Sequence, residues 1–280
     1  MEALQIAFPW GILVLFIVAL LLSSIGFKKF VYFLSIGYGF AVAGIGIALI
    51  VMSFIPGFYN GNINWVAYIL CILLILYGCR LSGFLLAREI KSASYRKKVF
   101  ENAETGSTKK MPFFVLFSIW IIVGILYVQE TSPIFYRLYN GKGDELLFPL
   151  IGAGIMFIAL LIETIADYQK SAAKKKNPKT FVSNGLYKFV RCPNYLGEIL
   201  FWTGVLVSGV NVISGWAQWI MVILGYVLIV YVMVSGAKRL EIRQDKSYGD
   251  DPKYQEYKKK TPILMHLIPV KSIKNWKWLK

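Results

Sequence analysis

Histidine and cysteine are scarce in this sequence. Its 280 residues hold one histidine, His266, and three cysteines, Cys71, Cys79 and Cys192. They form no evenly spaced set of the kind that predicts a disulfide framework or a zinc site. The chain also lacks a Walker-type glycine loop, a G-x-S-x-G elbow and any repeat of about 20 to 50 residues. These absences exclude the familiar signatures of soluble enzymes and repeat proteins.

Long apolar runs dominate the sequence instead. It is 57% hydrophobic and 16% aromatic, which is too apolar for a domain that folds in water. A helix that crosses a bilayer needs about 20 apolar residues. Seven stretches meet this requirement, at 8–27, 30–55, 63–86, 112–129, 146–166, 196–212 and 215–236. The sequence therefore predicts an all-α, polytopic membrane protein built as a seven-helix bundle.

The net charge of +16 is distributed on one side of these predicted spans. With the N-terminus outside, 29 of the 31 basic residues fall on the inner side, and only Arg137 and Lys142 fall outside. The positive-inside rule accounts for this bias if the C-terminus is cytosolic. Nucleic acid is not needed to explain the charge, and some of it is expected to face membrane lipids.

Ionisable residues collect in the C-terminal half, so we expect one membrane domain, residues 1–280, with two parts. Residues 1–145 are mainly scaffold and substrate cavity, and residues 146–270 carry the chemistry. In "IETIADYQKSAAKKKNPK", the residues Glu163, Asp167, Lys170 and Lys174 share one helix face. An ionised carboxylate at Glu163 is costly unless it faces a partner or a wet cavity. An interhelical pair is the structural alternative.

The stretch "GLYKFVRCPNYLGEILFW" predicts a helix that begins near Pro193. Its free N–H groups and its dipole would lie beside Arg191, a favourable place for phosphate. Asn194 and Glu198 are one turn apart and could together hold an amide group such as that of nicotinamide. A helix cap with one buried, hydrogen-bonded Glu is the structural alternative.

The stretch "GAKRLEIRQDKSYGDDPKYQEYKKKTPILMHLIP" places Arg239 and Arg243 one turn apart on a helix. Tyr254 and Tyr257 follow, and they could stack on a base or bind phosphate. An arginine pair that only anchors the last span is the alternative.

In combination, "ADYQK", "GLYKFVRCPNYLGE" and "YGDDPKYQEYKKKTP" resemble the C-terminal signature of the membrane-embedded steroid 5α-reductase family, in its bacterial form often labelled DUF1295. The resemblance implies a seven-helix bundle that holds NADPH in a cavity open to the cytosol. It also implies reduction of a carbon–carbon double bond conjugated to a ketone in a hydrophobic, lipid-like substrate, commonly a 3-oxo-Δ4-steroid. The bacterial form favours a bacterial inner membrane over the endoplasmic reticulum.

The resemblance also assigns roles to residues of this chain. It implies Tyr77 as the candidate acid, with Arg80 on the same helix. Glu163 lies at a comparable depth on helix 146–166 and completes the candidate catalytic residues. Together with the spacing arguments above, the resemblance gives twelve candidate residues for NADPH, which are Asp167, Lys174, Lys179, Tyr187, Arg191, Asn194, Tyr195, Glu198, Arg239, Arg243, Tyr254 and Tyr257. No metal is implied. Where the family usually has a histidine, this chain has Cys192, and helix 30–55 contains no acidic residue.

Two other functions stay open at this point. An S-adenosylmethionine-dependent membrane methyltransferase similar to isoprenylcysteine carboxyl methyltransferase shares the Arg-x-Pro-x-Tyr-x-Gly turn and a similar tail. Such enzymes usually carry adjacent glutamates after the last helix, where this chain has only Glu241. A non-catalytic lipid-binding membrane protein is the third possibility. The cofactor distinguishes these three functions.

Overall fold

The computed structural model describes residues 9–58, 62–91, 111–264 and 270–279, and every regular element within these ranges is a helix. The prediction of an all-α protein is therefore confirmed. Residues 92–110 of the predicted basic loop and His266 lie outside the described residues. The chain divides into two compact units. Unit 1 comprises Met1–Ala153 with Val205–Gly225, and unit 2 comprises Gly154–Gly204 with Tyr226–Lys280.

Six helical segments among the described residues are long and apolar enough to cross a membrane. They are Trp10–Phe27, Phe30–Met52, Trp65–Lys91, Phe113–Asn140, Leu147–Lys176 and Gly215–Tyr248. The predicted sixth span is also a helix, α8 (Pro193–Gly209), but it has 17 residues. At about 1.5 Å per residue it is about 26 Å long, slightly shorter than a hydrocarbon core of about 30 Å. The count of seven spans and their orientation stay predictions.

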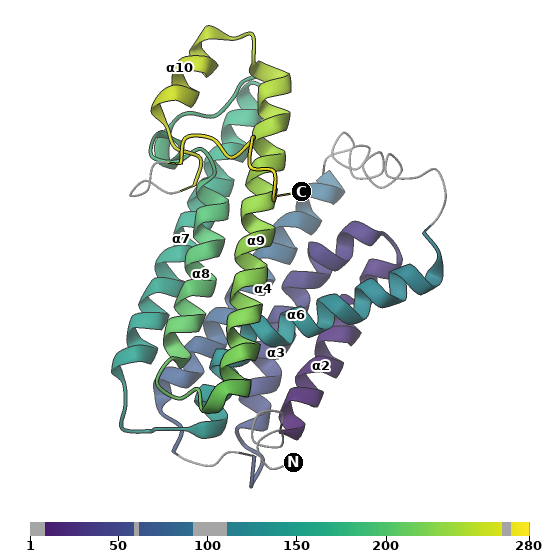
Figure 1. Cartoon of the computed structure of the whole chain (residues 1–280), viewed down its shortest axis with the longest axis vertical. Helices are drawn as coiled ribbons and strands as arrows, with labels where there is room; N and C mark the ends of the chain where they lie inside the picture. The colour runs from purple at the N-terminus through teal and green to yellow at the C-terminus, as the bar shows by residue number, and fades with distance from the viewer. Residues whose placement is uncertain (1–8, 59–61, 92–110, 265–269, 280) are drawn as a thin grey trace. The chain divides into compact units, whose positions relative to one another are not determined.

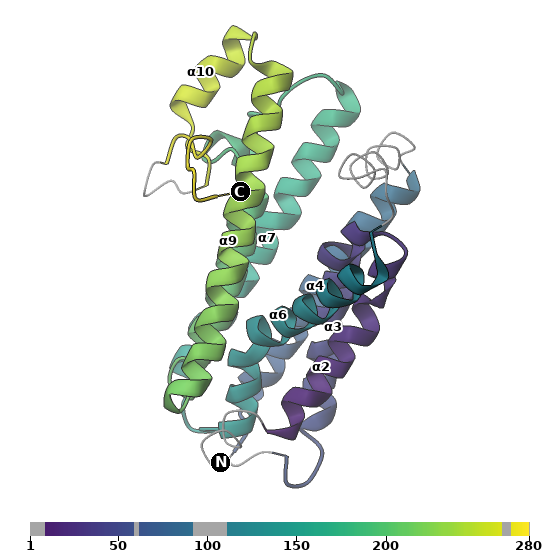
Figure 2. The same ribbon diagram turned by 45° about the vertical axis from the view of Figure 1, so that its right-hand side comes forward.

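Unit 1 is built on the helices α2 (Trp10–Ser23), α3 (Ile36–Met52), α4 (Trp65–Lys91) and α6 (Phe113–Asn140), with short 3-10 helices at Ser24–Phe27 and Phe30–Leu34. Helices α2, α3 and α4 lie side by side in both views (Figures 1 and 2). Small residues bring α3 and α4 together. A Cβ on Gly46 would lie 2.9 Å from the carbonyl oxygen of Cys71, so the two backbones are in contact there. Such close packing is how helices associate in a bilayer, where burial of apolar surface gives no driving force.

Helix α6 extends well beyond the predicted span 112–129. It continues to Asn140 and ends at Gly141, whose φ of +28° suits glycine. The reason is that the polar residues in its last turns have partners inside unit 1. Arg137, which is 2% exposed, donates to the carbonyl oxygen of Ser208 at 2.7 and 3.0 Å and pairs with Glu145 at 3.3 Å. Hydropathy alone places the end of this helix too early, at residue 129. The polar residues that follow lower the mean hydropathy, although their side chains have partners within the protein.

Unit 2 contains most of α7 (Leu147–Lys176), α8 and α9 (Gly215–Tyr248), together with the short helices η3 (Gly185–Lys188) and α10 (Pro252–Lys260). In Figure 1, α7, α8 and α9 stand side by side and α10 follows the end of α9. Asp251 caps α10 by accepting a hydrogen bond from the Lys253 N–H at 2.9 Å. The predicted extension of the fifth span past residue 166 is confirmed, since α7 is one continuous helix of 30 residues.

The C-terminal segment packs against the residues that precede α8. The Arg191 N–H donates to the carbonyl oxygen of Pro262 at 2.9 Å, and the Cys192 N–H donates to that of Ile263 at 3.0 Å. The Ile263 N–H in turn donates to the carbonyl oxygen of Val270 at 2.9 Å. The position at which α8 begins is therefore held by residues about 70 positions further along the chain.

Candidate functional site

Several predicted site residues of unit 2 gather around the start of helix α8. The helix begins at Pro193, as the sequence predicts, because proline fits a first turn and needs no N–H partner there. The N–H groups of Asn194 and Tyr195 then have no partner within the helix. Asn194 and Glu198 are four residues apart and share a face. The start of α8 therefore presents two backbone donors, a carboxamide and a carboxylate close together.

Helix α9 adds positive charge to this cluster. The Tyr195 phenol interacts electrostatically with Glu198 on its own helix and with Arg239 and Arg243 on α9. Both arginine side chains are exposed. The two helices approach closely here, because a Cβ on Gly236 would lie 3.1 Å from the ring of Tyr195. Two of the residues predicted to bind NADPH are thus accessible beside the start of α8.

Helix α7 supplies two carboxylates. Glu163 is 2% exposed and lies where α7 meets α8. A Cβ on Gly197 would lie 2.5 Å from the Glu163 Cγ and 3.2 Å from the carbonyl oxygen of Ala159, so only glycine fits at that crossing. Asp167, one turn further along α7, is half-buried and interacts electrostatically with the Tyr187 phenol.

The side chain of Asn194 carries a buried hydrogen-bond acceptor that accepts no hydrogen bond from the described residues. Its carboxamide oxygen is inaccessible to solvent and has no hydrogen-bond partner among the described residues. A buried acceptor without a hydrogen bond costs about 1–3 kcal/mol. The same holds for the hydroxyl of Ser235, which precedes Gly236 on α9. No motif singles out Ser235, because serine is common in apolar helices. The two groups mark positions at which a ligand could supply hydrogen bonds.

Arg191 has protein partners. Its side chain is 1% exposed and donates to Glu241 at 2.9 Å, to the carbonyl oxygen of Thr261 at 3.2 Å and to that of Lys271 at 2.5 Å. Only Nη1 has no hydrogen bond to a described residue. In the structure Arg191 ties the C-terminal segment to α9, and its predicted contact with phosphate stays a prediction.

The two lysines near the end of α7 differ in their surroundings. Lys174 donates to the carbonyl oxygen of Pro178 at 3.1 Å and to the Tyr248 hydroxyl at 2.6 Å, and it also contacts the carbonyl oxygen of Thr180. Lys179 lies on the exposed turn that follows. Of these two predicted phosphate ligands, Lys179 is the more accessible.

The predicted tyrosines Tyr187, Tyr254 and Tyr257 belong to the packing of unit 2. The Tyr254 hydroxyl donates to Asp245 at 3.0 Å and the Tyr257 hydroxyl donates to the carbonyl oxygen of Tyr187 at 2.7 Å. Both rings contact Phe181, with centroids 5.4 and 5.6 Å apart. Burial raises the pKa of all three phenols, and the hydrogen bond to Asp245 contributes at Tyr254. They are therefore neutral hydrogen-bond donors at physiological pH, and their predicted contact with a nucleotide is not tested by the structure.

Cys192 is buried among apolar side chains at the base of the C-terminal segment. Its side chain is 1% exposed and lies in an apolar cluster whose other buried members are Ala237, Ile263, Leu264, Ile273 and Leu279. Burial raises the pKa of the Cys192 thiol to about 12, so it stays protonated. The position that the family usually fills with histidine therefore packs against the C-terminal segment in this chain.

The predicted catalytic residues fall in different units. Tyr77 is fully buried in unit 1, where its hydroxyl donates to the Tyr38 hydroxyl at 3.2 Å. Arg80 is half-buried one turn further along α4. Glu163 belongs to unit 2, so a shared site for these three side chains stays a prediction. The Tyr77 ring is fully buried within unit 1, whereas an aromatic anchor at the membrane surface would be exposed.

Six helices among the described residues are long and apolar enough for a multi-pass integral membrane protein, and polar residues of unit 2 gather at the start of α8. Residues 40–261 match the family described as "Protein of unknown function (DUF1295)". The chain therefore belongs to the DUF1295 family, which is associated with steroid 5α-reductase-like proteins. No curated protein and no solved structure matches the chain.

Proposed function

We propose that this protein is a membrane-embedded, NADPH-dependent reductase of a carbon–carbon double bond conjugated to a ketone, acting on a lipid-like substrate of the 3-oxo-Δ4-steroid class. The observation that carries the proposal is the buried, unused carboxamide oxygen of Asn194 at the start of α8. Membership of the DUF1295 family and the resemblance of residues 160–269 to steroid 5α-reductases support it.

The side chains around Asn194 fit the nicotinamide end of NADPH. A nicotinamide carboxamide offers N–H donors, and Asn194 offers the acceptor that lacks a partner. Glu198, one turn deeper and 9% exposed, provides a second acceptor on the same face. The two residues would orient the nicotinamide ring by fixing its amide group.

The charged residues around the cluster fit the phosphate end. Arg239 and Arg243 are exposed on α9 beside the start of α8, and Lys179 is exposed after α7. Arginine binds phosphate oxygens through paired donors. The N–H groups at the start of α8 add donors of the kind that bind anions.

When bound, NADPH supplies the hydride that adds to the β-carbon of the enone. A proton must reach the α-carbon, and a donor must polarise the ketone oxygen. We assign the donor role to the Tyr77 phenol, and an orienting role to Arg80 and Glu163. Apolar helices exclude water from the substrate.

The proposal is tested by NADPH binding to the detergent-purified protein, measured by calorimetry. Asn194→Leu keeps the size of the side chain and removes the acceptor, so the Kd for NADPH should rise about 5- to 10-fold, as for loss of one hydrogen bond. Asn275→Leu, at an exposed position of the C-terminal segment, is the matched control and should leave the Kd unchanged.

Wild-type protein that is folded but does not bind NADPH would refute the proposal. Binding of S-adenosylmethionine instead would favour a methyltransferase. The structure does not favour that alternative, because Glu241 is fully buried and paired with Arg191. Binding of neither cofactor would favour a non-catalytic lipid-binding protein.

A further inference from the structure

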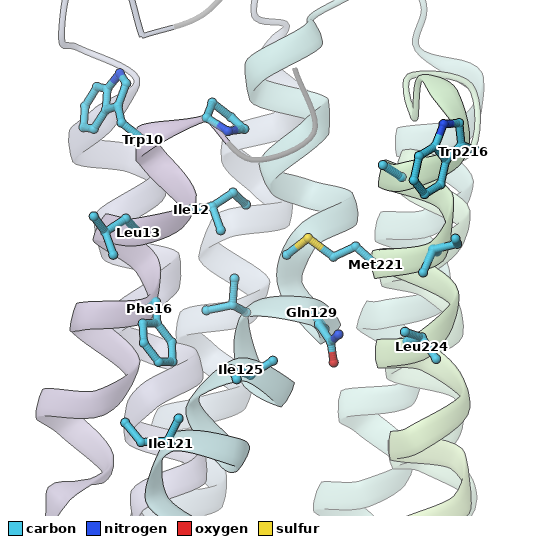
Figure 3. A pocket seen from close by; sticks show the side chains of 14 residues that line it. Trp10, Ile12, Leu13, Phe16, Ile121, Ile125, Gln129, Trp216, Met221 and Leu224 are labelled. Atoms are coloured by element: carbon cyan, nitrogen blue, oxygen red, sulfur yellow. The ribbon is translucent and has the colours of Figure 1, made fainter. Parts of the chain in front are cut away.

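Unit 1 contains a pocket that the proposed reductase site does not use. Its volume is about 740 Å³, within the range of small-molecule sites. It lies among α2, α6 and the first turns of α9, and all of its lining residues belong to unit 1 (Figure 3). The lining residues are Pro9 and four residues of α2, four of α6 including Gln129, and five of α9 including Trp216, Ala217 and Met221.

The wall of this pocket is almost entirely hydrocarbon. None of the residues that line it is charged, and Gln129 carries their only carboxamide. An anionic or zwitterionic headgroup would find no charged partner inside the pocket. Trp10 and Trp216 mark one end of it, each at the start of its helix (Figure 3). Tryptophan is typical of the region where hydrocarbon meets headgroups. The pocket therefore suits an uncharged molecule.

Gln129 gives the pocket one polar contact point. Its side-chain amide makes no hydrogen bond to any described residue, and Figure 3 shows it between α6 and α9. Its backbone is fixed by contact with α9, because a Cβ on Gly225 would lie 2.6 Å from the Gln129 carbonyl carbon. A carboxamide that faces hydrocarbon without a partner is unfavourable by at least about 1 kcal/mol. An occupant with one hydroxyl or carbonyl oxygen would satisfy it.

The dimensions limit the size of the occupant. The lining residues of α6 run from Ile121 to Gln129, which is about 12 Å along a helix. This is less than half of a hydrocarbon core of about 30 Å. The occupant therefore lies within one leaflet, and a molecule that spans the bilayer would not fit.

We propose that this pocket binds a neutral, mostly hydrocarbon molecule whose single hydroxyl or carbonyl oxygen pairs with the Gln129 amide. The lining residues include none of the residues proposed to bind NADPH, so binding to this pocket can be measured without the cofactor. A phospholipid headgroup has no charged partner among the lining residues, so the occupant that we propose is not a phospholipid held by its headgroup.

Quenching of tryptophan fluorescence tests the proposal, because Trp10 and Trp216 line the pocket. The probe is a dibrominated long-chain fatty alcohol added to protein in nanodiscs without NADPH. We expect saturable quenching that is lost in the double variant Trp10→Phe, Trp216→Phe. Dibrominated phosphatidylcholine, which reports lipid that surrounds the helices, should give only non-saturable quenching.

Two further variants separate polar recognition from simple filling of space. Gln129→Leu should weaken the saturable component about 5- to 10-fold, and Ala217→Phe should abolish it by filling the pocket. Met111→Leu, at an exposed position that does not line the pocket, is the control and should bind as the wild type does. Equal binding by wild type and Gln129→Leu would overturn the proposal. So would quenching that does not saturate, or that the brominated phospholipid reproduces.

Discussion

The buried ion pair between Arg191 and Glu241 gives the sharpest prediction of this structure. Glu241 is fully buried and accepts hydrogen bonds from the Arg191 side chain at 2.9 Å and from the Ile273 N–H at 3.0 Å. Glu241→Gln keeps the shape of the side chain and removes its charge. Arg191 is then left as a buried cation, because its other partners are carbonyl oxygens. Lys258 stays paired with Asp245 at 2.7 Å and needs no new partner.

The expected loss of stability in Glu241→Gln follows from the cost of removing one partner of a buried ion pair. Removing one partner of such a pair destabilises a protein by about 3–5 kcal/mol. The loss should be local to the C-terminal segment, which Arg191 ties down through the carbonyl oxygens of Thr261 and Lys271. Cys192 lies beneath that segment and is 1% exposed. Its accessibility therefore reports whether the segment is in place.

The assay is the rate at which a maleimide labels Cys192, followed by mass spectrometry in a Cys79→Ser background. Cys79 is the exposed cysteine, and Cys71 is buried in unit 1. Glu241→Gln should raise the labelling rate of Cys192 by roughly 10²-fold or more, since 1.4 kcal/mol corresponds to a factor of about 10. Glu256→Gln, in the exposed pair with Lys260, is the matched control and should leave the rate unchanged. A change of less than about threefold in Glu241→Gln would refute the reasoning.

Three other predictions follow from particular positions. Gly197→Ala should destabilise the protein in an SDS titration by about 1–3 kcal/mol, because its Cβ would overlap α7, whereas Gly154→Ala has open space and should be neutral. Tyr77→Phe should leave NADPH binding intact and slow enone reduction by roughly 10²-fold in single turnover, and equal rates would remove Tyr77 from the mechanism. Cysteines placed at Gly141 and Lys179 should be labelled from the outer and the cytosolic side, respectively, and labelling of both from one side would contradict the predicted orientation.

The sequence predicts the elements whose determinants are local. The start of α8 depends on Pro193 and its neighbour, and the continuation of α7 past residue 166 depends on helix formers with no breaker before Lys176. The shared face of Asn194 and Glu198 needs only helical periodicity. These features of the fold and of the candidate site are therefore readable without a structure.

The features that the sequence does not reveal depend on distant partners. The sequence predicts that Arg191 binds phosphate. In the structure its side chain donates a hydrogen bond to Glu241, which lies 50 positions further along the chain. Cys192 looks like a lost functional group until the C-terminal segment is seen to pack against it. The last turns of α6 look like a loop because the groups that satisfy Arg137 come from Glu145 and from Ser208. Residue type and spacing cannot show whether a charge is already neutralised.

The attachment of the last residues to the start of α8 has a consequence for biogenesis. The N–H groups of Arg191 and Cys192 donate to the carbonyl oxygens of Pro262 and Ile263, and Lys238 donates to the carbonyl oxygen of Trp276 at 2.9 Å. Residues 262 and 263 are synthesised after all of the apolar helices that precede them in the chain. The start of α8 therefore receives these partners only after the apolar helices have been made. Deleting residues 262–279 would leave the apolar helices without the contacts that hold the start of α8.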